Sequence, residues 1–371
     1  MRTILFVTID PIEHRRKLLD AISVARQAGY KTETISLSED RNKQNTSDIK
    51  YIYIPFKSGP SKFIMFNLIL FLKIIFKKYD VIHMRGLWVL PAIIKRQFFN
   101  RSRLIYDAHE FFAGHEIFQT PSIPRSIWLG IEKMAIPFIS HLITVSEPLA
   151  DFYKERYPNL KKISVIRNIP SLKQVVDFNS INDTKSKKYR TILFHGYFLK
   201  GRSLSQIINA MTFLRNLPVR LILVGQGPLK DELLRQVEES ELQEVVEFHD
   251  FVAGEDLIQF LSRAYIGLSI IQADSINRKY ALPNKFFELI TAGVPVLASD
   301  IPTLKSYVEK YKVGRTVNPE DPQKIATAIK KMISEPEELL QMRKNCIFAA
   351  QSELNWETES TKLLSIYAEE K

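Results

Sequence analysis

Short apolar runs alternate with helix-like stretches along the whole chain. In the first part the runs lie at residues 2–9, 31–37, 51–55, 80–84, 103–107, 141–146 and 163–170. Amphipathic patterns with helical spacing separate them, at 15–28, 63–77, 88–98 and 127–138. Gly29 suits the end of the first helix, and Ser146 can cap a helix after the sixth run. Strands alternating with helices are typical of a parallel sheet covered on both faces, so residues 1–170 are predicted to form one doubly wound α/β domain.

The alternation stops and then restarts. Residues 171–189 are rich in Asn, Ser and Lys and are predicted to be a linker. New apolar runs follow at 191–196, 220–225, 245–250, 265–271, 294–299 and 313–317. Because a helical segment follows each run, residues 190–354 are predicted to form a second doubly wound domain. Two such domains in tandem place a cleft between the carboxyl ends of their strands, where open α/β sheets bind ligands.

Composition narrows the class of protein. The 371 residues are 45% apolar and 25% charged, as in ordinary globular proteins. Cys346 is the sole cysteine, which excludes an intrachain disulfide and Cys-ligated zinc or iron–sulfur sites and favours a reducing compartment. The N-terminal apolar run is too short and too soon polar for a signal peptide. We therefore expect a cytoplasmic protein.

The net charge of +11 is unevenly distributed. Residues 1–190 hold 31 Lys and Arg against 17 Asp and Glu, whereas residues 191–371 hold 21 against 24. The excess is densest from Lys50 to Arg103, where Asp80 is the only acidic residue. Nucleic acid, an anionic membrane and a phosphorylated substrate each explain such an asymmetry. A nucleic-acid module is disfavoured because no basic motif with interleaved aromatic residues is present.

An apolar helix predicted at 63–77 lies in this basic region. Its apolar span of about 14 residues falls short of the roughly 20 that cross a bilayer. Two interpretations stay open: a buried helix, or an interfacial helix whose flanking lysines meet anionic lipid. Those lysines are Lys62, Lys73, Lys77 and Lys78.

One loop of the second domain has the residues of an anion site. After the strand at 191–196 come Gly196, Lys200 and Arg202, and a helix with capping-box spacing opens at Ser203. Backbone N–H groups at a helix start, beside two cations, suit a diphosphate, whereas the alternative is an exposed basic loop.

A second segment adds a carboxylate. Asn284 is placed to cap an apolar helix that carries Glu288 near the carboxyl edge of the sheet. A carboxylate there can accept hydrogen bonds from both hydroxyls of a ribose. The alternative is a Glu that merely complements the helix dipole.

In the first domain, Asp107 ends the strand at 103–107 and His109 and Glu110 follow it, so that acidic, basic and hydrogen-bonding groups come together. A metal site that adds His115 and Glu116 is an alternative, but the HExxH spacing is absent and we predict no metal. The glycines of "LILVGQGP" form only a tight turn, since the rest of a dinucleotide fingerprint is missing.

Together these segments resemble the retaining glycosyltransferases of family 4, which have the GT-B fold. The resemblance runs in order through "DVIHMRG", "LIYDAHE", "HLITVSEPLADFY", "ISVIRNIP", "FHGYFLKGRSL", "LILVGQGP", "LPNKFFELITAGVPVLASD" and "NWETESTKLLSIY". It implies two tandem Rossmann-like domains, the first binding an acceptor and the second a nucleotide-sugar. It also implies a C-terminal helix, at about 355–371, that returns to the first domain.

The resemblance further implies roles for single residues. His109, Glu110 and Arg202 are expected to be catalytic, with His109 near the reacting carbon of the donor sugar. The expected donor-binding residues are Gly196, Lys200 and Arg202 at the diphosphate, Glu288 at the ribose, Asn284 and Lys285 beside sugar and phosphates, and Asp250, Phe251 and Val252 at the base.

The sequence departs from the family pattern in two places. Many members carry two glutamates eight residues apart, and the position that partners Glu288 is Tyr280. The Gly-Gly loop that usually follows the first strand is replaced by a segment holding Asp10, Arg15 and Arg16, which are expected to contact the acceptor.

The implied reaction moves a sugar, a hexose or N-acetylhexosamine, from a nucleotide-diphosphate-sugar to a saccharide acceptor with retention of configuration. We expect a UDP-sugar rather than a GDP-sugar, a lipid-linked acceptor, no cofactor, and a role in cell-surface polysaccharide or glycolipid synthesis. The basic first domain is expected to dock on the anionic inner face of the cell membrane. An epimerase or phosphorylase on the same fold, and a catalytically silent binding subunit, remain alternatives.

Overall fold

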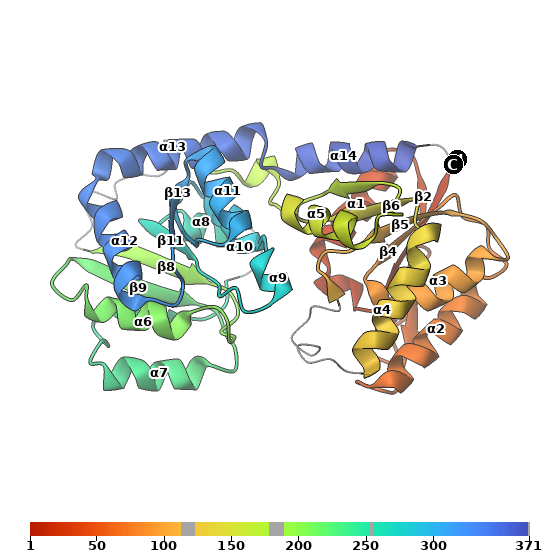
Figure 1. The fold of residues 1–371 in the computed structure, drawn as a ribbon, viewed down its shortest axis with the longest axis horizontal. Coiled ribbons are helices and arrows are strands. Elements are labelled where there is room, and N and C mark those ends of the chain that lie inside the picture. The colour runs from red at the N-terminus through yellow and green to blue at the C-terminus, as the bar shows by residue number, and fades with distance from the viewer. Residues whose placement is uncertain (113–122, 178–188, 253–255, 370–371) are drawn as a thin grey trace. The chain divides into compact units, whose positions relative to one another are not determined.

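In the computed structural model, the described residues are 1–112, 123–177, 189–252 and 256–369. The chain divides into two compact units (Figure 1). Unit 1 comprises Met1–Asn168 and Glu359–Lys371, and unit 2 comprises Ile169–Thr358. The chain therefore passes from one unit to the other twice. Of the predicted linker, residues 178–188 lie outside the described residues.

Unit 1 is built on a parallel sheet of seven strands in the order β3-β2-β1-β4-β5-β6-β7. The strands are β1 Thr3–Thr8, β2 Lys31–Ser38, β3 Ile49–Tyr53, β4 Val81–Arg85, β5 Arg103–Asp107, β6 His141–Thr144 and β7 Ile163–Val165. The central strands β4 and β5 are buried along their whole length, as expected for a sheet covered on both faces. In their register, Arg85 lies opposite Asp107 at the carboxyl edge.

Among the described residues, the α-helices that connect these strands are α1 Arg16–Gln27, α2 Pro60–Ile74, α3 Leu90–Gln97, α4 Ile123–Ala135 and α5 Glu147–Arg156. Gly29 adopts a positive φ just after α1, and the Ser146 hydroxyl accepts a hydrogen bond from the Leu149 N–H at 3.4 Å, so both predicted helix ends are confirmed. Helix α2 begins earlier than predicted because Pro60 occupies its first turn. Helices α2, α3 and α4 pack side by side in that order (Figure 1).

Unit 2 is built on a parallel sheet of six strands in the order β10-β9-β8-β11-β12-β13. The strands are β8 Arg190–His195, β9 Val219–Val224, β10 Val246–His249, β11 Ile266–Ser269, β12 Val296–Ser299 and β13 Gly314–Val317. The helices are α6 Leu204–Thr212, α7 Lys230–Glu239, α8 Asp256–Leu261, α9 Ile276–Lys279, α10 Asn284–Thr291, α11 Pro302–Tyr311, α12 Pro322–Ser334 and α13 Pro336–Ser352. Two apolar cores cover this sheet, one containing α6 and α12 and the other containing α10.

The last helix, α14 (Trp356–Ala368), packs against unit 1 along most of its length. The Tyr367 hydroxyl lies 2.7 Å from Nδ1 of His83 on β4, and Arg103 on β5 donates to the backbone carbonyls of Ile366 and Tyr367. The predicted fold, two doubly wound Rossmann-like sheets with a C-terminal helix that returns to the first, is confirmed.

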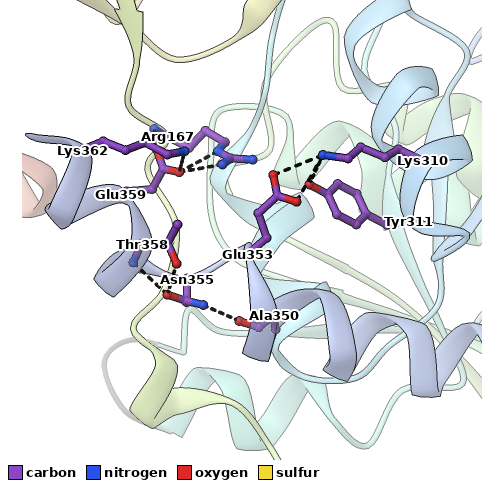
Figure 2. A network of polar contacts seen from close by, with 9 residues as sticks. All are labelled: Arg167, Lys310, Tyr311, Ala350, Glu353, Asn355, Thr358, Glu359 and Lys362. Atoms are coloured by element: carbon purple, nitrogen blue, oxygen red, sulfur yellow. Dashed lines mark hydrogen bonds and ion pairs between the residues drawn. The ribbon is translucent and has the colours of Figure 1, made fainter.

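Polar side chains fasten the chain where it leaves unit 2 and enters unit 1 (Figure 2). Within unit 2, Asn355 accepts a hydrogen bond from the Thr358 N–H at 2.9 Å and donates to the Ala350 carbonyl at 2.9 Å. Within unit 1, the buried Glu359 carboxylate accepts bonds from the Arg167 backbone N–H at 2.7 Å and from its guanidinium at 2.6 Å. The chain is therefore bonded within unit 2 up to Thr358 and within unit 1 from Glu359 onward.

Candidate functional site

The loop after β8 is shaped by close backbone contacts. Gly196 follows β8 with a positive φ, and its N–H donates to the Val224 carbonyl at the end of β9. Gly225 lies so close that a Cβ on it would stand 2.0 Å from the Gly196 carbonyl oxygen. The glycines of "LILVGQGP" are therefore packing positions at which the β8 and β9 loops touch.

Arg202 ends this loop beside Gly196, with Nη1 4.0 Å from where a Gly196 Cβ would stand. Burial lowers the pKa of its guanidinium. The predicted capping box at Ser203 is wrong: Ser203 adopts a left-handed backbone conformation and its hydroxyl makes no capping hydrogen bond to α6. Lys200 is exposed and offers its carbonyl to Arg278 at 3.1 Å.

Helix α10 brings Lys285 and Glu288 to the same edge. Lys285 is 5% exposed, and in the described part of the chain its ammonium has no hydrogen-bond partner. The ammonium instead lies 4.0 Å from the ring centre of Phe194 on β8. Burial, and then the positive charge of Arg202, hold the pKa of Lys285 well below its usual value. The negative charge of Glu288 opposes this lowering, but no described residue accepts a hydrogen bond from the buried ammonium, and such a group is costly to leave unbonded.

The Glu288 carboxylate is oriented by a neighbour that the sequence analysis did not identify. Oε2 of Glu288 lies 2.8 Å from Nε2 of His195, the last residue of β8, which is itself buried. A signal was present in the sequence, because His195 directly precedes Gly196 at a predicted carboxyl strand end. The predicted Asn284 cap is wrong: Pro283 occupies the cap position, and Asn284 is an exposed first residue of α10.

The segment predicted to line the base follows β10 at the same edge of the unit 2 sheet. Asp250 is almost fully exposed, and its carboxylate lies 3.3 Å from the Lys230 ammonium. Phe251 is exposed, and Val252 packs partly against the core that contains α10. Tyr280, at the position of the family's other glutamate, ends α9, where Arg278 pairs with Asp274.

Asp107 ends β5 within a buried charge cluster in unit 1. Its carboxylate lies 3.3 Å from Lys17 on α1, 3.6 Å from Arg85 and 3.9 Å from His83. Although burial opposes ionisation, the positive charge of Lys17 leads the effects that hold the pKa of Asp107 well below its usual value. Lys17, His83 and Arg85 were not identified from the sequence. The signal was the presence of His and Arg in an otherwise apolar strand.

His109 packs with its ring edge-on to Phe112, and Nε2 lies 3.8 Å from the Glu110 carboxylate. Burial, and then the positive charge of Arg85, lower the pKa of His109 to about 3. The imidazole is therefore neutral at physiological pH. No group of three or more potential metal ligands occurs among the described residues, which do not include His115 and Glu116.

The three residues predicted to contact the acceptor differ in their contacts. Asp10 and Arg15 pair with each other at 3.0 Å. Arg15 also lies within electrostatic range of His109. Arg16 is the first residue of α1 and approaches Asp20 on the helix surface instead.

Two protein families match the two parts of the chain. Residues 18–169 match "Glycosyltransferase Family 4", and residues 176–351 match "Glycosyl transferases group 1". The chain belongs to this family of glycosyltransferases, as the sequence resemblance indicated.

Among individual proteins, the chain is 30% identical over 100 residues to the chitobiosyldiphosphodolichol beta-mannosyltransferase of Yarrowia lipolytica. This match covers 27% of this chain and 21% of that protein. The chain spans between about a fifth and three fifths of the length of four curated relatives that it matches. The sucrose-phosphate synthase of Thermosynechococcus elongatus has a similar fold, with a TM-score of 0.77 and 19% identity over 99% of this chain and 98% of that one. The structure of Anabaena Alr3699/HepE in complex with UDP also has a similar fold, with a TM-score of 0.76. The two chains are 15% identical, and the match covers 99% of this chain and 100% of that one.

Proposed function

We propose that the protein is a retaining glycosyltransferase that moves a sugar from a UDP-sugar to a saccharide acceptor. One observation carries the proposal: the buried ammonium of Lys285, which has no hydrogen-bond partner in the described residues, lies at the same strand edge as Arg202 and Gly196. Burying an unpaired cation is costly unless an anion completes the site. A nucleotide diphosphate supplies that charge.

In the proposed reaction, the bond between the anomeric carbon and the diphosphate oxygen breaks while the acceptor hydroxyl attacks from the same face. The hydroxyl proton passes to the departing diphosphate, so no separate strong base is required. Catalysis then rests on stabilising the leaving charge, for which Lys285, Arg202 and Lys200 are proposed. Cationic side chains fixed before binding do this without reorganisation at the moment of reaction.

The other expected contacts are retained as parts of the proposal. Glu288, held by His195, is proposed to accept hydrogen bonds from the ribose hydroxyls. The segment 250–252 is proposed to line the base. His109 is neutral at physiological pH and can accept or donate a hydrogen bond to a sugar hydroxyl without introducing a positive charge near the reacting carbon.

UDP is favoured over GDP because a structural neighbour, Anabaena Alr3699/HepE, was crystallised with UDP and with UDP-glucose. A lipid-linked acceptor is favoured because a curated relative is named for chitobiosyldiphosphodolichol, an acceptor that carries a diphosphate and dolichol. The basic surplus of unit 1 accords with work at the inner face of an anionic membrane. Among the described helices, none has both the length and the hydropathy to cross a bilayer.

The test is incubation with a panel of nucleotide-sugars, with and without saccharide acceptors, while release of nucleoside diphosphate is measured. Arg202→Ala is expected to lower turnover by at least about a hundredfold, as for removal of one donor to a developing charge. The exposed Arg263→Ala is the matched control and is expected to match the wild type. Nucleotide-sugar conversion without diphosphate release would indicate an epimerase, and binding without turnover a silent subunit. Near-normal turnover by Arg202→Ala would contradict the assignment.

A further inference from the structure

Helix α2 presents an apolar stripe to solvent as well as to the protein. Phe66, Leu70 and Ile74 face inward and are fully buried. Ile64, Leu68, Leu72 and Phe76 recur at the same four-residue spacing and are 69%, 57%, 64% and 88% exposed. A helix that is apolar all round is normally enclosed by protein or lipid. An exposed apolar stripe of this kind is typical of a surface that meets an apolar partner.

Exposed aromatic residues continue this stripe at the amino edge of the unit 1 sheet, where α2 and α3 both end. Phe98 and Phe99, just after α3, are 74% and 63% exposed, and Phe99 packs edge-on to Phe71 of α2. Phe76 follows the last turn of α2. Three large aromatic side chains thus lie at one corner of the unit, at the end opposite to Asp107.

A cavity of about 700 Å³ opens at this corner. Phe98 and Phe138, which pack edge-on with ring centres 5.6 Å apart, form part of its wall. Among the described residues that line it, Arg101, Arg103, Lys161 and Lys162 are cationic and Glu369 is acidic. Arg103 is 5% exposed, and its Nε has no hydrogen-bond partner in the described part of the chain.

Local structure explains the positive charge of this cavity only in part, since Arg103 donates to the last carbonyls of α14. Cations at helix ends complement the helix dipole. Arg101, Lys161 and Lys162, however, lie in the loops before β5 and β7, outside any helix. Glu369 is shared by Arg103 at 3.8 Å and Lys162 at 3.2 Å and does not neutralise the group. A surplus of cations in a cavity bordered by exposed phenylalanines fits an anionic group attached to an apolar body.

We propose that this cavity binds the phosphate of an anionic phospholipid headgroup, while Phe76, Phe98, Phe99 and the outer stripe of α2 enter the interfacial layer of the membrane. The inference deepens the proposed function, because it assigns a site to the membrane partner of the transferase. It does not depend on the donor site, which belongs to unit 2. Polybasic surfaces with aromatic and aliphatic side chains are the usual combination for such binding.

The test is co-sedimentation with phosphatidylcholine vesicles, with and without phosphatidylglycerol. Wild-type protein is expected to bind only the anionic vesicles. The triple variant Arg101→Glu, Lys161→Glu, Lys162→Glu is expected to bind them at least about tenfold more weakly. The matched control is Lys305→Glu, Lys324→Glu, Lys331→Glu, which changes the charge equally in a unit 2 cavity of about 910 Å³ whose lining already mixes both signs. The control is expected to lose much less affinity.

The contribution of the apolar side chains is tested with the double variant Phe98→Ser, Phe99→Ser. Its control is the double variant Phe213→Ser, Phe348→Ser, which changes two exposed phenylalanines of unit 2. The first pair is expected to weaken vesicle binding and the second to leave it unchanged. Inorganic phosphate is expected to bind the vesicle-free protein much more weakly than anionic vesicles do, because it brings no apolar body. Tight binding of inorganic phosphate, without binding to anionic vesicles, would replace the lipid assignment with a soluble phosphate ligand.

Equal vesicle binding by the two charge-reversal variants would overturn the inference. The inference would also fail if the wild-type protein did not bind anionic vesicles. Circular dichroism and UDP calorimetry check that each variant is folded and keeps its donor site. Failure of the proposed function is seen separately, as absence of UDP binding and of diphosphate release in vesicle-free buffer.

Discussion

Replacing Lys285 with Met is expected to stabilise the protein without ligand and to weaken donor binding. The ammonium is buried and lacks a hydrogen-bond partner within the described residues, and such a group costs about 1–3 kcal/mol, or more when charged. The Phe194 ring, 4.0 Å away, offsets this by about 0.5–2 kcal/mol. Met keeps the aliphatic stem and removes the charge. The net gain is therefore about 1 kcal/mol.

For a unit of the size of Ile169–Thr358, that gain raises the melting temperature by about 2–4 °C, measured by calorimetry without nucleotide. Loss of one charge-assisted hydrogen bond to the diphosphate costs about 1.5–3 kcal/mol, which weakens UDP binding about ten- to a hundredfold. The exposed Lys305→Met is the control for both measurements and is expected to match the wild type.

Proton uptake gives a third readout of the same change. The pKa of Lys285 is lowered in the free protein by burial and by Arg202, and a bound diphosphate would raise it again. UDP binding at mildly alkaline pH is therefore expected to take up protons in the wild type, but not in the Met variant. Calorimetry in buffers of different ionisation enthalpy measures this uptake. A variant that melts lower than the wild type and binds UDP equally well would refute the reasoning.

Three further predictions concern both units. Glu359→Gln removes the negative charge that pairs with the buried Arg167 guanidinium and is expected to lower the unfolding free energy of unit 1, measured in urea, by about 3 kcal/mol. Lys362→Ala removes a partly exposed partner of the same carboxylate and is expected to lower it by less than about 1 kcal/mol. Equal losses in the two variants would contradict the burial argument. The pKa of His109 is about 3 when folded and about 6.5 when unfolded, so the unfolded state binds more protons in that window and stability falls as pH falls through it. His109→Gln should show a smaller loss between pH 7 and pH 5 in urea titrations. An unchanged loss would count against an imidazole that stays neutral in the folded state. Glu288→Gln is expected to remove most of the preference for UDP over 2′-deoxy-UDP, measured by calorimetry. An unaltered preference would show that this carboxylate does not bind the ribose.

Much of the site could be located from sequence because parallel strands deliver their carboxyl ends to one edge. Asp107, Gly196, Asp250 and Glu288 were all placed at such ends, or on the helix beside one, by the alternation of strands and helices. Local capping was predicted less well. Ser203 has the spacing of a helix cap, but its backbone is in the left-handed conformation. The loop that ends at Ser203 also contacts the loop after β9.

The partners of these residues could not be predicted, because they come from elements far apart in the chain. His195 meets Glu288 across 93 positions, and Lys17 meets Asp107 across 90. Spacing along a strand or helix carries no information on such pairs. They depend on which helix packs over which strand.

The amino-acid sequence by itself determined the two alternating α/β halves, the strand ends that hold the site and the uneven charge, since each follows from local periodicity and composition. Only the tertiary structure decided which charges are buried and which apolar residues are exposed. Lys285 loses water because α10 packs over Phe194, and Phe76 remains exposed because α2 is covered on one side alone. Burial is a property of packed elements, and one helical pattern can be enclosed or left open according to its neighbours.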